Sequence, residues 1–177
     1  MDFFQVLHSR HSVRAFENRV VADETLRQIL EAMNSAPSAG DLQAYEVVVV
    51  EDGERRERLA VAADQRFLVE APVVLVFFVD ANRSRKTYGS RGAHLYALQD
   101  TTIAAAYAQL AAQALGLGTI WVGAFDEAQV AAAVDAQRTL RPVAMIALGY
   151  PAETPEPMSR RTLDDLVARE SFAAPRS

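Results

Sequence analysis

The sequence predicts an α+β fold, a three-layer α/β/α sandwich with a central mixed, mostly antiparallel sheet. Four short runs rich in apolar residues have the length and composition of buried strands. Segments with helical spacing separate these runs without strict alternation, which favours a mixed sheet over a doubly wound one. A chain of 177 residues is long enough for one sizeable core but short for two, so residues 1–177 are expected to form a single domain.

The first half of the chain supplies two helices and two strands in this prediction. Residues 2–9 read as a short apolar helix, and Asp23 is expected to N-cap a second helix that ends before the loop 37–40. The runs 45–51 and 72–80 are rich in Val and Phe and lack the polar alternation of a surface strand. Both runs are therefore expected to be central strands.

The longest helix is expected over residues 91–115. One stripe at helical spacing contains Ile103, Tyr107 and Leu110, and a second face is almost entirely alanine. A helix that is apolar nearly all round must be buried by more than one partner. We therefore expect the alanine face to pack against a second subunit of a homodimer.

The remaining elements follow from the same patterns. Charges interleaved with apolar residues over 53–63 suit a helix that returns over the sheet. Residues 119–123 and 142–149 read as two more strands separated by a helix over 127–134. A short helix is expected over 163–169.

Composition excludes several classes of protein. The chain has no cysteine, so disulfides, thiolate nucleophiles and iron–sulfur sites are excluded, which fits a reducing cytoplasm. No stretch approaches the ~18 consecutive apolar residues of a membrane span, and no signal peptide is visible. A net charge of -5 argues against a nonspecific nucleic-acid binder. The expected partners are small molecules.

The strongest local signal is the segment Arg10-His11-Ser12-Val13-Arg14. If this segment is extended, its side chains alternate, so Arg10, Ser12 and Arg14 point the same way. Guanidinium groups match phosphate oxygens bidentately, which makes these three residues a candidate phosphate cradle. The alternative interpretation is a solvated basic surface segment.

Other motifs give weaker signals. The three histidines have no metal-ligand spacing, so no metal site is expected. Gly116, Gly118 and Gly123 do not form a dinucleotide-binding motif, because they follow a helix and open a strand. The basic residues of 83–86, together with Arg91, could attract the phosphate of a pyridine nucleotide, and a mobile solvated loop is the alternative.

The chain resembles the nitroreductase family in five motifs that occur in family order along nearly its whole length. They are the segment 10–14, the small-residue loop 35–45, the strand 71–76, the helix from 96 that ends in the glycine-rich stretch 116–125, and the closing strand 148–151 followed by Arg160 and Arg161. Five motifs in the right order are difficult to obtain by chance. The resemblance implies a nitroreductase-like sandwich that binds FMN at the interface of a homodimer.

The resemblance also implies roles for particular residues. The opening motif and the terminal basic residues of the family bind the FMN phosphate and ribityl chain, the small-residue loop leaves room for the ring system, and the turn at 123–125 brings a backbone amide near flavin N5. The implied cofactor-binding residues are Arg10, His11, Ser12, Arg14, Pro37, Ser38, Ala39, Asp41, Gln43, Gln65, Gly123, Ala124, Arg160 and Arg161.

Three of the implied residues have a carboxylate or amide side chain: Asp41, Gln43 and Gln65. Asp41 replaces the usual Asn of the family, so it loses the amide donors and, if ionised, adds a charge that disfavours an anionic reduced flavin. Gln43 keeps the family amide. Gln65 matches a position whose amide commonly faces the pyrimidine edge of the flavin, and plain surface exposure is the alternative.

The implied activity is two-electron transfer from NADH or NADPH through FMN to a nitroaromatic, a quinone or another flat acceptor. The cofactor supplies the chemistry, so no side chain is expected to be catalytic. Two alternatives remain open. One is a specialised FMN-dependent oxidase or dehalogenase-type relative. The other is a non-catalytic flavin-binding homodimer. The replacement of the usual Asn by Asp41 is the sequence feature that favours it.

Overall fold

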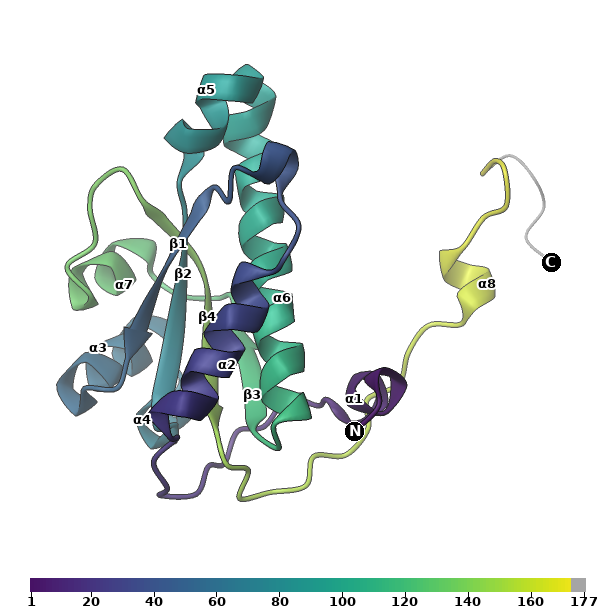
Figure 1. The fold of residues 1–177 in the computed structure, drawn as a ribbon. Helices are drawn as coiled ribbons and strands as arrows, with labels where there is room; N and C mark the ends of the chain where they lie inside the picture. Colours follow the sequence, from purple (N-terminus) through teal and green to yellow (C-terminus); the bar gives the residue numbers. More distant parts are fainter. Residues whose placement is uncertain (173–177) are drawn as a thin grey trace.

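The chain folds around one four-stranded sheet, in a computed structural model that describes residues 1–172. The strands are β1 (Tyr45–Val50), β2 (Val73–Val79), β3 (Gly118–Val122) and β4 (Arg141–Gly149), in the spatial order β1-β2-β4-β3 (Figure 1). All three strand pairs are antiparallel. The predicted α+β class with a mostly antiparallel sheet is confirmed.

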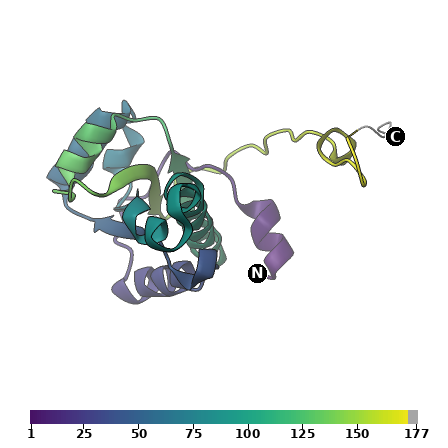
Figure 2. The ribbon, with the colours of Figure 1, turned by 90° about the horizontal axis from the view of Figure 1, so that it is seen from above.

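Helices cover both faces of this sheet (Figures 1 and 2). One face carries α2 (Asp23–Asn34) and α6 (Ala97–Ala114), and the other carries α3 (Gly53–Ala63), α4 (Phe67–Glu70) and α7 (Glu127–Ala133). The remaining helical segments are α1 (Phe3–Ser9), the 3₁₀ turn η1 (Ala39–Asp41), α5 (Ala81–Arg91), the π-helical turn η2 (Gly92–Tyr96) and α8 (Leu163–Leu166). The three layers agree with the predicted sandwich.

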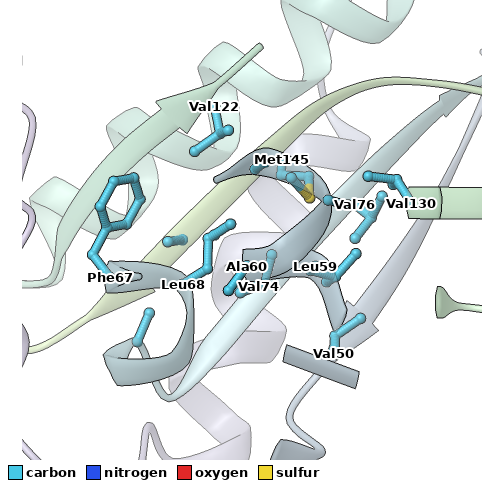
Figure 3. Close-up of a cluster of buried hydrophobic side chains, with 14 of the residues drawn as sticks. Val50, Leu59, Ala60, Phe67, Leu68, Val74, Val76, Val122, Val130 and Met145 are labelled. Atoms are coloured by element: carbon cyan, nitrogen blue, oxygen red, sulfur yellow. The ribbon is translucent and has the colours of Figure 1, made fainter. Parts of the chain in front are cut away.

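The core lies on both sides of strand β2, all seven residues of which are buried. Val74, Val76 and Phe78 join the cluster beneath α3 and α7 that Figure 3 shows in part. Val73, Leu75 and Phe77 join the cluster beneath α2 and α6. Because successive side chains of a strand point to opposite faces, two covered faces require an unbroken apolar run.

Strand β1 is not central, and the prediction that it would be is wrong. Within residues 1–172 it pairs only with β2, so it forms an edge of the sheet. Its valines nevertheless contact both core clusters, Val48 on one face and Val47 and Val49 on the other. Helical cover on both faces makes an edge strand as apolar as a central one.

Several predicted helix boundaries also change. Ala22, not Asp23, is the N-cap of α2, and Asp23 is the first helical residue, where its charge still complements the helix dipole. Helix α8 is shorter than predicted because Val167 is already extended. The basic residues of 83–86 belong to helix α5 and not to a loop.

The long predicted helix is present as η2 followed by α6, but its alanine face points inward. Ala105, Ala108 and Ala112 are buried against the chain's own sheet and α2. The prediction that this face meets a second subunit is therefore wrong, because small side chains let α6 approach its own sheet closely. The outward stripe contains Tyr107, which is 38% exposed, with Ile103 and Leu110 half-buried.

The two ends of the described chain lie outside the three layers. Helix α1 and the tail that carries α8 project from the same side of the sandwich (Figures 1 and 2). Within residues 1–172, no helix combines the length and the apolar character that crossing a membrane requires.

Candidate functional site

The segment Arg10–Arg14 lies along the start of strand β3. Ser12 forms an isolated parallel bridge with Thr119, and the amide of Val13 donates to the Thr119 carbonyl at 3.0 Å. The Val13 side chain is buried, whereas Arg14 is exposed and Arg10 and Ser12 are half-buried. A buried Val13 between a half-buried Ser12 and an exposed Arg14 agrees with an extended backbone, in which neighbouring side chains point to opposite sides.

Gly118 makes room for this segment. A Cβ atom at Gly118 would lie 2.7 Å from Cγ2 of Val13, a distance that real Cβ atoms essentially never show. The glycine at the strand entry therefore lets the Arg10–Arg14 segment approach β3 closely. This is a packing role, distinct from a dinucleotide-binding motif.

The chain returns to the same place after β4. Phe16 and Pro151 form an antiparallel bridge, and the Ala152 amide donates to the Ala15 carbonyl at 2.9 Å. Oε1 of Glu153 accepts the amides of Arg14 (2.5 Å) and Ala15 (3.2 Å). The start of the C-terminal tail is thus fixed to the end of the candidate phosphate-binding segment, a contact that the sequence did not reveal.

Arg160 and Arg161 lie further along the tail and are exposed. Arg160 donates to the Ser159 carbonyl at 3.4 Å, and Arg161 donates to the Asp165 carbonyl at 2.6 Å. Both contacts are local, and the tail runs away from the sandwich at this point (Figure 2). Within one chain, the described structure does not join these arginines to Arg10, Ser12 or Arg14 by a hydrogen bond.

Gly123 and Ala124 follow the other end of β3 and are exposed. The turn that they begin returns to α3, because the amide of Asp126 donates to the Ala62 carbonyl at 2.9 Å. Gln65 is exposed just after α3, on the same side of the sheet. The Arg10–Arg14 segment therefore borders the start of β3, and the turn at Gly123 and Ala124 follows its end.

The small-residue loop has an unusual backbone. Gly40, Asp41 and Gln43 all have positive φ, at 58°, 54° and 47°. Non-glycine residues rarely adopt this conformation, so surrounding contacts must hold it. The backbone amide of Gln43 donates to Oγ of Ser38 at 3.0 Å. The side-chain NH2 of Gln43 donates to Asn34, to the backbone carbonyl oxygen at 3.1 Å and to Oδ1 at 3.0 Å. The Gln43 side-chain NH2 is thus engaged within the loop.

Asp100 on helix α6 accepts hydrogen bonds from two backbone amides that flank the positive-φ residues of this loop. Its side chain is buried, Oδ1 accepts the Ala39 amide at 2.9 Å, and Oδ2 accepts the Ala44 amide at 3.5 Å. Its charge also reaches Tyr45, where burial raises the pKa of the hydroxyl, the hydrogen bond from Gln43 lowers it, and Asp100 raises it further. This role of Asp100 was not predicted from the sequence, although a carboxylate between Ala97 and Ala104 on an inward face was a usable signal.

An open, largely apolar cavity of about 640 Å³ lies where the loop meets α6. Its lining comes from Pro37, Ser38 and Ala39 on one side and from residues between Tyr96 and Ile103 on the other. The volume is in the range of pockets that bind drug-sized molecules. The loop therefore borders a space large enough for a flat organic ligand.

Helix α5 covers the far side of the loop. The Tyr88 hydroxyl lies so close to Gly40 that a Cβ atom there would clash with it, and Nε of Arg83 donates to the Leu42 carbonyl. Tyr88 also contacts Tyr96 edge to face, with 5.2 Å between the ring centroids. The guanidinium of Arg91 lies over the Tyr96 ring, and its Nε donates to the Tyr96 hydroxyl at 3.0 Å.

Helix α6 separates the two groups of candidate residues. The loop is tied to Asp100 near its start, and Ser9, just before Arg10, accepts a hydrogen bond from Gln113 near its end, at 3.0 Å. Thirteen residues of α-helix at about 1.5 Å per residue span roughly 20 Å. One chain therefore presents the loop and the Arg10–Arg14 segment near opposite ends of α6.

The structure is thus an α+β sandwich that carries two separate groups of candidate site residues. A family model described as "Nitroreductase family" matches residues 7–67 and 60–150 of this chain. The chain belongs to the nitroreductase family, as the sequence motifs indicated.

Two named proteins are similar to this chain in sequence. The chain is 32% identical over 161 residues to "FMN reductase [NAD(P)H]" of Bacillus subtilis, covering 83% of this chain and 65% of that protein. It is 31% identical over 186 residues to "NADH dehydrogenase" of Thermus thermophilus, covering 89% and 91%. The chain thus spans just under two thirds of the length of the Bacillus relative.

A solved structure gives the same picture of the fold. The NADPH:FMN oxidoreductase from Vibrio harveyi, complexed with NAD+, superimposes with a TM-score of 0.88 at 26% identity. The alignment covers 97% of this chain and 78% of that one. The relatives are NAD(P)H-dependent oxidoreductases by name.

Proposed function

We propose that this protein is an FMN-dependent oxidoreductase that takes two electrons from NADH or NADPH and passes them to a nitroaromatic, a quinone or a related flat acceptor, working as a homodimer. Membership of the family supports an oxidoreductase, and two relatives carry FMN in their names. The choice of FMN and of the acceptor for this chain is part of the proposal.

The observation that carries the proposal is the separation of about 20 Å along α6 between the phosphate-binding candidates and the small-residue loop. A single flavin site needs donors for the phosphate and a slot for the ring. In the proposed dimer, the Arg10–Arg14 segment of one chain faces the loop 37–43 of the other. Twofold symmetry then creates two equivalent sites.

The residues fit the proposed cofactor chemically. Arg10, Ser12 and Arg14 lie on an extended segment that is hydrogen-bonded to β3 at Thr119. They offer cationic and hydroxyl donors suited to a phosphate. The loop at Pro37–Ala39 borders an apolar cavity suited to a planar ring. The turn at Gly123 and Ala124 follows the strand β3 whose start borders the phosphate segment. This turn and Gln65 complete the proposed contacts from that chain.

Exposed apolar side chains support the dimer. Phe3 and Phe4 on α1 are 61% and 69% exposed, and the tail exposes Met158, Leu163 and Val167. Together with the outward stripe of α6 at Tyr107, they form apolar surface that a second chain would cover. Folding of the tail across the partner would also bring Arg160 and Arg161 near a phosphate.

Bound FMN would supply the redox chemistry between a hydride donor and an acceptor. The protein's own residues bind the phosphate, shape the ring slot and exclude water, so we assign no catalytic side chain. The apolar lining of the cavity suits flat aromatic acceptors more than strongly hydrated ones.

The absorbance spectrum of the untreated protein tests the proposal. We expect flavin bands, and we expect them to bleach when NADPH or NADH is added without oxygen and to return with a quinone or nitroaromatic. A colourless protein that does not take up added FMN would overturn the proposal. A yellow protein that bleaches with dithionite but with neither nucleotide would instead favour the non-catalytic flavin-binding dimer.

A specialised acceptor is the second candidate, favoured by Asp41 in place of the usual Asn. This carboxylate is exposed on the loop whose residues 37–39 line the proposed ring slot, and near the ring it would disfavour an anionic reduced flavin. Turnover rates across nitroaromatics, quinones, free flavins and halogenated aromatics would separate a general reductase from a specialised relative.

A further inference from the structure

Asp100 is the only charged side chain that is buried within residues 1–172, with 2% of its surface exposed. Burial of a carboxylate is costly unless a cation or hydrogen bonds compensate it. No lysine, arginine or histidine of the described residues forms an ion pair with it. Its compensation comes from the backbone amides of Ala39 and Ala44.

The two amides lie at the two ends of one loop. Ala39 begins the 3₁₀ turn η1, and Ala44 immediately precedes strand β1. Between them stand the three positive-φ residues Gly40, Asp41 and Gln43. One carboxylate on helix α6 therefore contacts the backbone on both sides of these residues, at 2.9 Å from the Ala39 amide and 3.5 Å from the Ala44 amide.

Asp100 also belongs to the lining of the cavity of about 640 Å³ that the proposed function assigns to the flavin ring. The other residues of that lining are uncharged: Pro37, Ser38, Ala39, Tyr96, Leu98, Gln99, Thr102 and Ile103. Asp100 thus combines two properties, control of the loop's shape and the only formal charge in the lining.

We propose that Asp100 is a positioning residue for the flavin, which sets the shape of the ring-facing loop through the Ala39 and Ala44 amides and keeps the reduction potential of the flavin low through its charge. This inference rests on the proposed function. A fixed negative charge beside a flavin opposes the anionic reduced form, so removal of the charge raises the potential.

The test compares Asp100→Asn and Asp100→Leu with the wild type. Asn keeps the size and one acceptor oxygen, so it can still accept from Ala39 but offers an N–H toward Ala44. Leu removes both acceptors. Thr101→Val is the matched control, because Thr101 is equally buried on the same helix but its hydroxyl bonds only to the Ala97 carbonyl of that helix.

Three readouts are used. In the FMN-free protein, amide exchange at Ala39 and Ala44 reports the loop, and we expect faster exchange in the order wild type, Asn, Leu. FMN affinity from fluorescence quenching should fall about tenfold in Asp100→Asn and further in Asp100→Leu, because a hydrogen bond to a charged group is lost. The flavin potential should become less negative in Asp100→Asn, and Thr101→Val should match the wild type in all three.

The outcomes separate this inference from the proposed function. Folded Asp100→Asn with wild-type FMN affinity and potential would overturn the positioning role, even if amide exchange changes, because Asp100 would then be merely structural. Failure of the wild-type protein to bind FMN would overturn the proposed function and the role toward flavin together. Amide exchange in the FMN-free variants would still decide whether Asp100 clamps the loop.

Discussion

Val13 rests directly on Gly118: the position of a Cβ atom on this glycine is 2.7 Å from Cγ2 and 3.0 Å from Cβ of Val13. Val13 is the buried residue at the centre of the candidate phosphate-binding segment, and its amide is bonded to Thr119 in the same strand. The packing of one side chain against one glycine therefore fixes the segment that carries Arg10, Ser12 and Arg14.

Gly118→Ala is expected to push this segment away from β3. Overpacking of this kind destabilises a protein by roughly 1–3 kcal/mol, and displacement of the arginines should weaken FMN binding. Urea unfolding and FMN titration measure the two effects. Gly53→Ala is the control, because a Cβ there meets no atom closer than 3.9 Å. Unchanged stability and affinity in Gly118→Ala would show that the contact does not position the segment.

Replacement of both Arg10 and Arg14 by Ala should weaken FMN binding while leaving the fold intact. Two hydrogen-bonding groups worth roughly 1.5–3 kcal/mol each correspond to a loss of at least ~100-fold in affinity. Arg58→Ala with Arg138→Ala is the control, since both arginines are exposed and their removal changes the net charge equally. Near-wild-type affinity in the Arg10 and Arg14 variant, measured by fluorescence titration, would refute the phosphate assignment.

Tyr107→Glu should break the proposed dimer, because it places a charge in the outward apolar stripe of α6. Light scattering at micromolar concentration should give a dimer for the wild type and a monomer for the variant, with loss of bound FMN. Val61→Glu is a matched control, because Val61 is 65% exposed on the opposite helical layer. A monomeric wild type would contradict the dimer.

Asp41→Asn restores the amide that is usual in the family at this position. Asn tolerates the left-handed conformation that Asp41 adopts, with φ at 54°, so the loop should keep its shape. Loss of the negative charge should make the flavin potential less negative. Asp64→Asn is the matched control, because it makes the same replacement at a residue with the same left-handed backbone conformation. Asp64 has φ at 51° and lies at the end of α3. Equal potentials in wild type and Asp41→Asn would show that Asp41 does not tune the flavin.

The sequence predicted the elements well because local patterns decide them. The unbroken apolar run of β2 and the extended Arg10–Arg14 segment both follow from the alternation of side chains along a strand. The same patterns cannot say which of two apolar faces of α6 meets the chain's own sheet. That choice depends on the close approach that alanine allows, which is a tertiary property.

The candidate site was predictable only through motifs of adjacent residues. Asp100 acts on Ala39, 61 positions earlier in the chain, and Glu153 acts on Arg14, 139 positions earlier. No local pattern links residues this far apart. The positive φ of Asp41 and Gln43 was equally hidden, because these residue types rarely adopt it and tertiary contacts impose it here.

A mixed-dimer experiment tests most directly whether the flavin site is shared between two chains. The Arg10→Ala and Arg14→Ala variant is coexpressed with Gly40→Val, which places a branched side chain at a φ of 58° and disrupts the loop. Each variant alone should bind no FMN at concentrations that saturate the wild type. With random pairing of the two chains, about a quarter of all sites combine an intact segment with an intact loop. FMN binding restored to about that level is the predicted result, and no restoration in folded, mixed dimers would contradict a site built from two chains.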